Sequence, residues 1–489
     1  MIWTETPTKP LSLRPEGVKL NPRDLVAGRY GTYDMIQIFG PDKTIEYQLN
    51  AQAVAVATLS RLHPDIVSSE IATEIAQKAN IKYVSPERVR ELEEQTGHDI
   101  IALNTALEEV LSENARPHVN KARTSADTTQ TARAMQFRQA LLVVDKTVRN
   151  LRDVLIEKAV VWQDFPSMDT THLYDAMPTV AGRPFVHYAE MLQSGLYFLR
   201  FVHDNSLKGK WGDATGNHHS ATTLGIDGMV LQDDYTASLG VGRMIAAAQL
   251  PGLEFEADVH YVLTRLGETI GNIARYIATG RGDDPNIFVN ASPIRKKGSS
   301  AMPHKDAKNG NPTAEEQAMA MTNYLRGGMT TALVNCDMPY ARNLAASASA
   351  RIIFENGFKF FDHATRRLAS TVYWLGLNEG RATERVNRSY GAVTSAQIMT
   401  CLTDSRMVSN PMGRGEAHEL VGRLASEAWN GRRQFLDVLL ANAEVNSRIP
   451  ADRLRQLADP ALYVGESKRI IQAVKDACYR KATFPSVAQ

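Results

Sequence analysis

Three long segments in the middle of this 489-residue chain constrain its fold more than any other feature. In each of them, apolar residues recur every three or four positions, as one face of an α-helix requires. The segments are residues 138–160, 258–278 and 350–375. Their apolar positions occupy more than one face, which predicts helices buried against several neighbours. Few segments alternate with a period of two, so we expect strands to be a minor part of the fold.

The length of the chain predicts more than one structural unit, because a single core rarely organises so many residues. The helical pattern breaks near residues 375–380, and shorter, charged helical segments follow. We therefore expect an N-terminal helical domain at residues 1–122, a central bundle of long helices at 123–378 and a C-terminal helical domain at 379–489. The first 25 residues are rich in proline and are expected to run over the surface as an arm.

Charge and composition exclude several classes of protein. Lys and Arg number 55 against 54 Asp and Glu, which leaves none of the basic excess that a nucleic-acid binder shows. No uninterrupted apolar run is long enough to span a bilayer, and residues 1–22 do not resemble a secretory signal. Cys336, Cys401 and Cys478 lie far apart, as in proteins of a reducing compartment. These observations predict a cytoplasmic protein without nucleic-acid or membrane partners.

The segment most suggestive of chemistry is residues 298–305, with the sequence GSSAMPHK. A glycine precedes two adjacent hydroxyl groups, a Met-Pro pair stiffens the backbone after them, and a lysine closes the segment. This set suits the removal of a proton from carbon while negative charge builds on a neighbouring carboxylate. Consecutive backbone amides and Lys305 can supply the donors that such a dianion needs.

The segment closely resembles the signature loop of the fumarase/aspartase superfamily, whose members eliminate fumarate from succinyl compounds. The resemblance implies that Ser300 is the catalytic base, and that Ser299 and Lys305 bind the succinyl part of the substrate. A serine is a poor base at its free pKa, so its activation requires a closed, dewatered loop.

The chain departs from the superfamily pattern after Lys305, where we infer an insertion of four residues before Asn311. We predict that Asn311, a further substrate contact in the family, caps the next helix and that Pro312 occupies its first position. Glu316 falls where the family has the acid that ends the loop, although Glu315 is an alternative.

A second segment, residues 170–179, resembles the family segment whose histidine protonates the departing nitrogen. The resemblance assigns this role to His172 and substrate binding to Thr171. An imidazole with an ordinary pKa near 6.5 is a competent acid at neutral pH. The alternative is a histidine that only caps a turn. Tyr174 stands where the family usually has glutamine, so one hydrogen bond to a substrate carboxylate would be made differently.

Three further matches point to the adenylosuccinate lyase family within this superfamily. The pair His98-Asp99 resembles the His-Asp pair at the end of that family's first domain and would bind substrate. Arg29-Tyr30 precedes the first long helix, as does an Arg-Tyr pair that helps to hold the phosphate. Gln249 matches, more loosely, a glutamine that contacts the purine.

Residues 118–127 resemble another family motif, with two extra residues inserted. The match implies that Thr124 and Ser125 hydrogen-bond a substrate carboxylate and that His118 also contacts substrate. A histidine in a surface loop is the alternative for His118. Asp127 is an equally good candidate for the N-cap of the following helix.

Residues 342–351 carry the match that selects a substrate. Arg342, Ser347 and Arg351 stand where adenylosuccinate lyases contact the nucleotide. Ser347 and Arg351, four positions apart, would share one face of a helix. Arg342 must lie in the preceding loop to converge with them. Guanidinium groups bind phosphate through paired hydrogen bonds; the alternative is an ordinary solvated helix start.

The resemblance extends from about Arg29 to Gly465 and implies an all-α, three-domain fold. In that family, long helices of four subunits form one bundle, and each active site gathers residues from three chains. The expected reaction is elimination of fumarate from adenylosuccinate to give AMP, with the succinyl-carboxamide ribotide of purine synthesis as a second substrate. No cofactor is called for, and the adjacent His218 and His219 diverge on regular structure, so we predict no metal site. The alternatives are another fumarate-releasing lyase, acting on argininosuccinate, hydrazinosuccinate or nitrosuccinate, and a non-catalytic relative.

Overall fold

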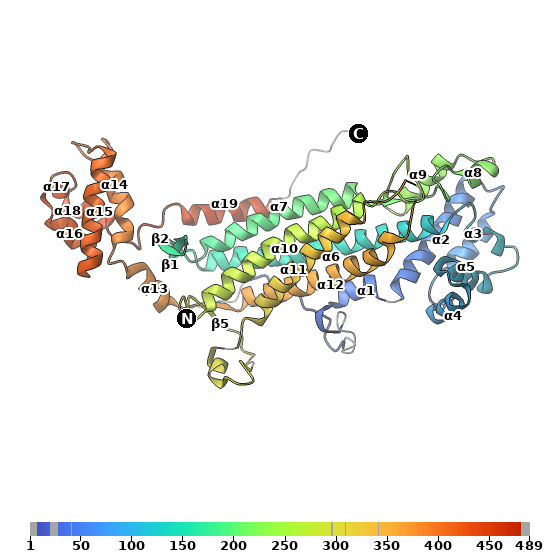
Figure 1. The fold of residues 1–489 in the computed structure, drawn as a ribbon, viewed down its shortest axis with the longest axis horizontal. Helices are drawn as coiled ribbons and strands as arrows, with labels where there is room; N and C mark the ends of the chain where they lie inside the picture. The colour runs from blue at the N-terminus through green and yellow to red at the C-terminus, as the bar shows by residue number, and fades with distance from the viewer. Residues whose placement is uncertain are drawn as a thin grey trace.

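Five long helices form the centre of the molecule (Figure 1). The computed structural model describes residues 7–19, 28–40, 42–294, 297–308, 310–340 and 342–480. The central helices are α6 (Ser125–Val161), α7 (Arg183–Asn205), α10 (Glu254–Arg281), α11 (Thr313–Val334) and α12 (Ala345–Tyr373). The longest, α6, has 37 residues and therefore extends roughly 55 Å. Three of them contain the segments in which the apolar spacing predicts long helices, and the predicted all-α fold is confirmed.

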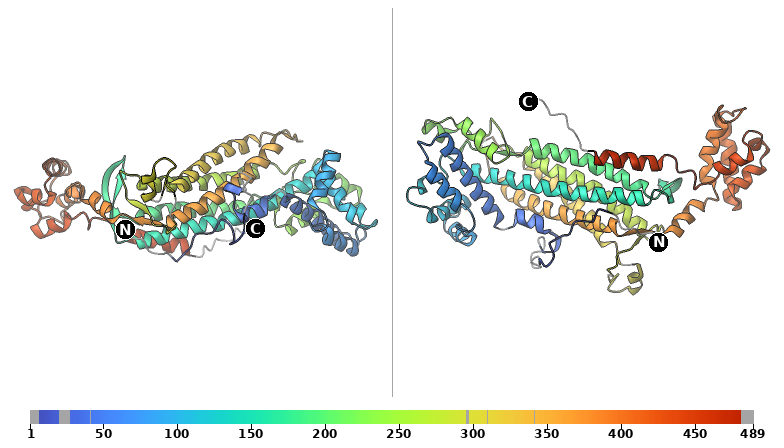
Figure 2. Two further views of the ribbon diagram at one scale, coloured as in Figure 1. Left: turned by 90° about the horizontal axis from the view of Figure 1, so that it is seen from below. Right: turned by 180° about the vertical axis from the view of Figure 1, so that it is seen from behind.

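Smaller helices gather at the two ends of the central bundle, so that the molecule is elongated (Figures 1 and 2). One end carries α2 (Lys43–Leu62), α3 (Ser69–Lys78), α4 (Pro86–Thr96), α5 (Asp99–Val110), α8 (His219–Thr223) and α9 (Gly228–Ser238). The opposite end carries α13 (Glu379–Asn387), α14 (Ser395–Thr403), α15 (Arg414–Gly431), α16 (Phe435–Ala441), α17 (Ala443–Asn446) and α18 (Ala451–Leu457). The last helix, α19 (Ser467–Tyr479), packs back along α7, and the short α1 (Tyr33–Phe39) lies against α6 and α12.

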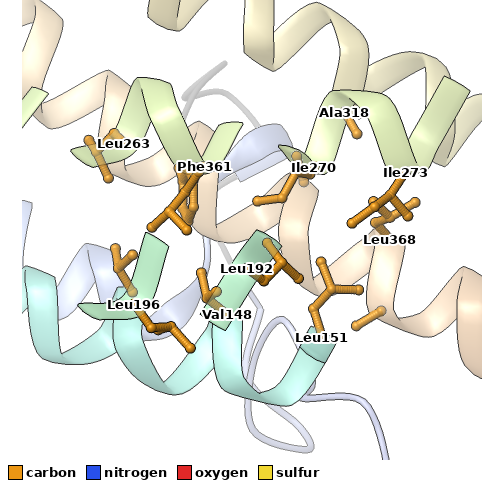
Figure 3. Close-up of a cluster of buried hydrophobic side chains, with 14 of the residues drawn as sticks. Val148, Leu151, Leu192, Leu196, Leu263, Ile270, Ile273, Ala318, Phe361 and Leu368 are labelled. Carbon is orange, nitrogen blue, oxygen red and sulfur yellow. The ribbon is translucent and has the colours of Figure 1, made fainter. Parts of the chain in front are cut away.

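The core divides into one large and two smaller main clusters of buried apolar side chains. The largest fills the central bundle, where Leu192 of α7, Val148 of α6, Ile270 of α10 and Phe361 of α12 meet in one layer (Figure 3). A second cluster joins α2–α5 to α8 and α9, and a third joins α14–α18. Each central helix touches neighbours on several sides, as predicted from apolar positions on more than one face.

Local sequence signals explain how α4 and α5 follow one another. Ser85 caps α4 by accepting a hydrogen bond from the amide of Arg88 at 3.2 Å, and Pro86 occupies the first helical position. Gly97 ends the helix with a φ of 65°, a left-handed conformation that glycine adopts without penalty. This turn places His98 directly at the N-cap of α5.

The described residues contain six short strands in three two-stranded sheets. They are β1 (Pro166–Thr171) with β2 (Tyr174–Val180), β3 (Lys208–Gly209) with β4 (Gly242–Arg243), and β5 (Phe288–Asn290) with β6 (Leu375–Leu377). The first pair is an antiparallel hairpin beside α13, with a bulge between Met168 and Thr170. Strands are thus the minor component that the absence of period-two patterns predicts.

The described part of the N-terminal arm, residues 7–19, lies on α6. The Leu11 amide donates to Asn150 Oδ1 at 3.0 Å, and the Thr8 amide donates to Glu157 Oε2 at 2.8 Å. Residues 1–6 and 20–27 of the predicted arm fall outside the described ranges. Within those ranges, no helix combines the length and the apolar character that a membrane span needs.

Candidate active site

His98 stands at the N-terminus of α5 and faces the start of α6. Its Nδ1 accepts hydrogen bonds from the amides of Ile100 and Ile101 at 3.2 and 3.4 Å. Because Nδ1 is an acceptor, the neutral ring carries its proton on Nε2. Nε2 lies 3.5 Å from Ser125 Oγ, so the ring and the hydroxyl group share one polar surface. His98 and Ser125, which the sequence separately predicts as substrate-binding residues, thus lie side by side in one chain.

The start of α6 is held by a buried ion pair that the sequence did not reveal. Thr124 is the N-cap, and Asp127 completes a capping box by accepting from the Thr124 amide at 2.8 Å. The prediction of Asp127 as the cap itself is therefore wrong, because its carboxylate reaches back from the first turn. Asp127 also binds Lys210 Nζ at 2.5 Å, and both side chains are fully buried. The amides of Gly212 and Asp213 donate to the same carboxylate at 3.1 Å.

Arg123, within the motif that carries two extra residues, anchors the loop before α6. Its guanidinium lies 5.4 Å from the Trp211 ring centre and 5.1 Å from the Tyr235 ring centre, between two aromatic faces. It also donates to the Tyr235 hydroxyl at 2.9 Å. Asn120 and Ala122 have φ values of 51° and 54°, so the loop accepts strained backbone in reaching Thr124.

His118 is half-buried in the same loop, and its Nδ1 is buried without a hydrogen-bond partner. Burial and the neighbouring charge of Lys121 lower the pKa of this imidazole. The ring is therefore neutral at physiological pH. The structure places it beside Asn120 and Trp211, on the α2 side of the loop.

The residues that match the nucleotide contacts gather at the start of α12. Arg342 precedes the helix, as its spacing requires, and donates to Gln249 Oε1 at 3.0 Å. Burial lowers the pKa of its guanidinium. Arg351 is 64% exposed and lies 3.4 Å from Asp99 of the α5 start. Ser347 lines a small hollow next to Arg342. The two guanidinium groups, Gln249, Asp99, His98 and Ser125 thus occupy the same end of one chain.

His172 is presented by the tip of the β1–β2 hairpin. His172 and Leu173 have φ values of 53° and 70° and form the two-residue turn between the paired Thr171 and Tyr174. Two left-handed residues in succession match the twist of a tight hairpin but are unusual without Asn or Gly. Leu173 is 97% exposed and Tyr174 79% exposed. His172 is likewise exposed and occupies the turn itself.

Ser300 lies on a loop that leaves the bundle after β5, at the opposite end from α5 (Figure 1). Its side chain is exposed, whereas Ser299 Oγ accepts hydrogen bonds from the amides of Ala301 and Met302 at 3.3 and 3.2 Å. Two adjacent amides are thus already aimed at one oxygen atom. Lys305 Nζ donates to Asn311 Oδ1 at 3.2 Å. A cavity of about 880 Å³ lies between this loop and the end of α10, and Lys305, His304 and Asn311 are among its lining residues.

The end of the signature loop is fixed to α10 by a buried arginine. Arg281 Nη1 binds Glu315 at 2.5 Å, and both side chains are buried. Arg281 also donates to the Gly310 carbonyl at 3.3 Å. Glu316 is exposed, so Glu315, the alternative from the sequence, is the carboxylate that supports the loop.

The predicted capping of α11 by Asn311 is wrong. The helix begins at Thr313, Pro312 is its N-cap, and no side chain caps it. Pro312 has a ψ of 54°, outside helical values, and the Asn311 amide group is turned toward Lys305. The Asn311 side chain thus faces the loop and not the helix.

Arg29 and Tyr30 lie at the middle of the bundle, away from the start of α12. Tyr30 packs edge-on against Phe360 and His363 of α12, with ring centres 5.4 and 6.0 Å apart. Arg29 is exposed, and its guanidinium lies 6.0 Å from the Tyr30 ring centre. A hollow of about 240 Å³ lies beside Tyr30, lined by Gln317 and Met321 of α11.

Among the described residues, the predicted site residues therefore fall into separate groups within one chain. One group surrounds the starts of α5, α6 and α12; another is the hairpin tip; a third is the loop after β5; and Arg29-Tyr30 forms a fourth. The hairpin and the loop lie near the α13 end, whereas α5 lies at the other end of the long bundle (Figures 1 and 2). These groups are supported by four further residues, Lys210, Arg123, Asp175 and Glu315. Of these, only Glu315 was named as a candidate from the sequence.

Comparison with known proteins identifies the family. Residues 31–326 match the family described as Lyase, and residues 391–474 match the family described as adenylosuccinate lyase C-terminus. Adenylosuccinate lyase of Methanocaldococcus jannaschii is 26% identical over 447 residues, which are 91% of this chain and 94% of that protein. The protein of the same name from Pyrococcus abyssi is 28% identical over 450 residues, 91% of this chain and 96% of that protein.

Solved structures share the fold at lower identity. Fumarate lyase from Mesorhizobium sp. BNC1 has a TM-score of 0.78 at 20% identity, covering 91% of this chain and 98% of that one. The 3-carboxy-cis,cis-muconate lactonizing enzyme from Pseudomonas putida has a TM-score of 0.80 at 18% identity, covering 94% and 99%. Because the Lyase match covers more than half of the sequence, this chain belongs to the lyase family of the fumarase/aspartase superfamily, with a C-terminal segment of the adenylosuccinate lyase type.

Proposed function

We propose that this protein is a C–N lyase that eliminates fumarate from adenylosuccinate and leaves AMP, and that it acts likewise on the succinyl-carboxamide ribotide of purine synthesis. One observation carries the choice of a nucleotide substrate. Arg342 and Ser347 line one hollow at the start of α12, and Arg351 follows Ser347 by four residues on the same helix, so that two guanidinium groups are available to one phosphate. The near full-length similarity to adenylosuccinate lyases supports the same choice.

The reaction follows from the groups on the hairpin and the loop. Ser300 takes a proton from the succinyl carbon next to a carboxylate, and the electrons of that C–H bond form the new C=C bond. The C–N bond breaks, and His172 donates a proton to the departing nitrogen. Lys305 and backbone amides stabilise the negative charge that builds on the carboxylate before the C–N bond breaks. The step consumes no water, and Ser300 and His172 are restored by proton exchange.

The loop geometry supports this role for the amides. The N–H groups of Ala301 and Met302 share Ser299 Oγ as their acceptor. A substrate carboxylate is a stronger acceptor than a hydroxyl, because charge-assisted hydrogen bonds are roughly twice as strong as neutral ones. Substrate binding would therefore transfer these two donors from Ser299 to the carboxylate and draw the loop over the substrate.

The active site is completed by other copies of the chain, which form a homotetramer. The groups that bind and the groups that react lie at opposite ends of one chain, so they meet only if chains pack together. The central helices also expose large apolar side chains that packing would cover. They include Leu142 of α6, Phe201 of α7, Tyr261 of α10 and Leu333 and Val334 of α11. Light scattering of the purified protein tests this, and a stable monomer with full activity would contradict it.

The chain is proposed to divide into units at 1–122, 123–378 and 379–489, and α19 packs back on the central unit. Limited proteolysis that cuts near residues 123 and 378 would support the division.

The protein is also proposed to work in the cytoplasm, without a metal or organic cofactor, and without nucleic-acid or membrane partners.

The deciding experiment is an ultraviolet assay of adenylosuccinate cleavage by the purified full-length protein. We expect stoichiometric fumarate and AMP, and loss of both products in the Ser300→Ala variant. Argininosuccinate, hydrazinosuccinate and nitrosuccinate, tested in parallel, decide between this function and another fumarate-releasing lyase. Cleavage of one of these with no reaction on adenylosuccinate would reject the nucleotide substrate, and no cleavage of any would favour a non-catalytic relative.

A further inference from the structure

Asp175, on β2 of the hairpin that carries His172, forms ion pairs with two arginines of the C-terminal region. Its Oδ1 lies 2.5 Å from Arg385 Nη2, and its Oδ2 lies 2.6 Å from Arg388 Nη2. Arg385 belongs to α13 and Arg388 follows its last residue. Asp175 is 11% exposed and Arg385 16% exposed, so this part of the cluster is largely withdrawn from solvent. Each oxygen of the carboxylate thus lies beside a different guanidinium, and among the described residues only the contact with Arg385 has hydrogen-bond geometry.

Asp175 lies close to the turn that carries His172, so its ion pairs can affect the position of that histidine. Asp175 pairs with Thr170, and the next pair, Thr171 with Tyr174, closes the turn that carries His172. The tip itself is exposed, with Leu173 at 97%. Asp175 is therefore an ion-paired residue of β2 that lies next to the tip, one residue after Tyr174.

The rest of the hairpin is also held by the C-terminal region. Strand β1 packs against α13. Near the base, the hydroxyl groups of Thr179 and Ser467, at the start of α19, lie 3.4 Å apart and are buried. Between base and tip, the bulge at Met168–Thr170 interrupts the ladder and permits bending. Contacts outside the ladder can therefore help to fix the direction of the tip.

We propose that Asp175 is a positioning residue for His172, and that α13, through Arg385 and Arg388, sets where the general acid points. This inference rests on the proposed function, since it concerns the proton donor of that reaction. An uncompensated guanidinium in a largely buried place is unfavourable, so loss of Asp175 releases Arg385 as well as the hairpin. A displacement of the tip by about 1 Å is enough to lower a rate about 100-fold. The C-terminal region thereby takes part in catalysis without contributing a residue that touches the substrate.

The test compares Asp175→Asn and Arg385→Gln with Glu384→Gln in the full-length protein. Asp175→Asn keeps the size of the side chain and removes the charge. Glu384 is on the same helix but pairs with Arg381, at 2.6 Å, and is a matched control for loss of a charge on α13. The readouts are kcat and KM for adenylosuccinate, the solvent deuterium isotope effect on kcat, and hydrogen exchange of the hairpin peptide.

We expect Asp175→Asn and Arg385→Gln each to lower kcat about 10- to 100-fold and to change KM less than about threefold, because the loss falls on the transition state. The double variant should be no worse than Asp175→Asn alone, since Asp175→Asn already removes the ion pair with Arg385. The solvent isotope effect should rise as protonation of nitrogen becomes slower. Hairpin amides should exchange faster, with the melting temperature and the Glu384→Gln variant close to wild type.

Other outcomes overturn the inference. An Asp175→Asn protein with wild-type kcat and wild-type hairpin exchange would do so. So would a loss of kcat in Asp175→Asn that Arg385→Gln and Arg388→Gln do not share, because α13 would then not be involved. If Asp175→Asn does not fold, Arg388→Gln decides, because Arg388 is half-exposed. If the wild-type protein fails to cleave adenylosuccinate, the proposed function falls, and hairpin exchange alone decides whether Asp175 holds the tip.

Discussion

The two ends of the bundle differ in how complete their functional groups are. At the α5 end, His98, Ser125, Asp99 and Arg351 contact one another within a single chain, and a fully buried ion pair stiffens the loop beneath them. At the α13 end, His172 and Ser300 stand on an exposed hairpin and an exposed loop. In the proposed function, the first end binds the nucleotide, and the second presents the proposed acid and base to solvent.

Binding and chemistry place different demands on the fold. A phosphate site needs fixed charges, which one chain can provide by packing helix ends together. A base and an acid on opposite sides of a reacting bond need to approach the substrate after it binds. Exposed segments permit this, and in the proposed homotetramer neighbouring chains would complete the enclosure. The comparison predicts that damage at the α13 end lowers kcat, whereas damage at the α5 end raises KM or unfolds the site.

The largest effect is expected for Ser300→Ala, which removes the base at the α13 end. General base catalysis contributes roughly 100- to 10,000-fold, so kcat should fall by at least about 1,000-fold in a site that has no substitute base. Binding should remain within a few fold, because the α5 end is intact. Titration calorimetry with adenylosuccinate measures the binding. A Ser300→Ala protein of near wild-type activity would contradict the assignment of the base to Ser300 at the α13 end.

Lys210→Met tests the rigid support of the α5 end. It leaves the Asp127 carboxylate buried without its cation, which costs about 3–5 kcal/mol of unfolding free energy. The start of α6 and the turn at Gly212 and Asp213 should loosen together. Urea unfolding measures the loss, and Lys208→Met, a nearby lysine that binds only the Asn205 carbonyl in the described contacts, is the control. Equal stability of the two variants would mean that the buried pair does not hold this end.

The bundle that connects the two ends should weaken in acid, through His260. Burial lowers the pKa of this imidazole to about 4, from about 6.5 in the unfolded chain. Between these values the unfolded state binds a proton that the folded state does not, so stability falls as the pH drops from about 6.5 to about 4 and levels off below.

The loss from His260 should reach about 2–3 kcal/mol between pH 7.5 and 4.5. The His260→Asn variant, compared by urea unfolding at both pH values, should show a shallower dependence than wild type. His363, whose pKa is also lowered by burial to about 4, adds a similar dependence that the variant retains. An identical pH dependence in wild type and variant would contradict the assignment.

The smallest effect is expected for Arg351→Gln, at the exposed part of the α5 end. Loss of one hydrogen-bonded charge typically costs about 1.5–3 kcal/mol, which corresponds to a roughly 10- to 100-fold rise in KM. Because phosphate is bound equally in ground and transition states, kcat should change little. Arg326→Gln, which breaks an exposed pair with Glu268, is the control. A fall in kcat without a change in KM would mean that Arg351 acts in the chemical step and not in substrate binding.

Much of the fold, and some of the site, could be predicted from the sequence. Helical periodicity located α6, α10 and α12 but not α7 or α11, and the position of Arg342 before α12 followed from its spacing to Arg351. The hairpin was not predicted as strands, because residues 166–180 lack alternation and its turn, His172-Leu173, lacks the glycine or asparagine that marks tight hairpins. The cap of α11 was misassigned, because Asn311 is a good capping residue in any context and only the fold shows that Lys305 engages it.

The supporting residues could not be predicted, because their partners are distant in sequence. Asp127 and Lys210 are separated by 83 residues, and Asp175 and Arg385 by 210. No local spacing records such contacts. Lys210 shows this most clearly: a lysine is expected at the surface, and its ion pair with Asp127 together with its hydrogen bond to the Asp213 carbonyl explains its complete burial.

Each active site is proposed to join the base of one chain to the nucleotide-binding groups of another, and refolding two impaired variants together measures this. Ser300→Ala and Arg342→Gln/Arg351→Gln proteins are each unfolded, mixed in equal amounts and refolded together, and cleavage is assayed at a low substrate concentration. We expect the mixture to regain a substantial fraction of wild-type adenylosuccinate cleavage, because some sites then contain an intact Ser300 from one chain and intact Arg342 and Arg351 from another. Variants refolded separately and then combined should stay inactive. A mixture that stays as inactive as its parents, although mass spectrometry shows hybrid oligomers, would contradict the account.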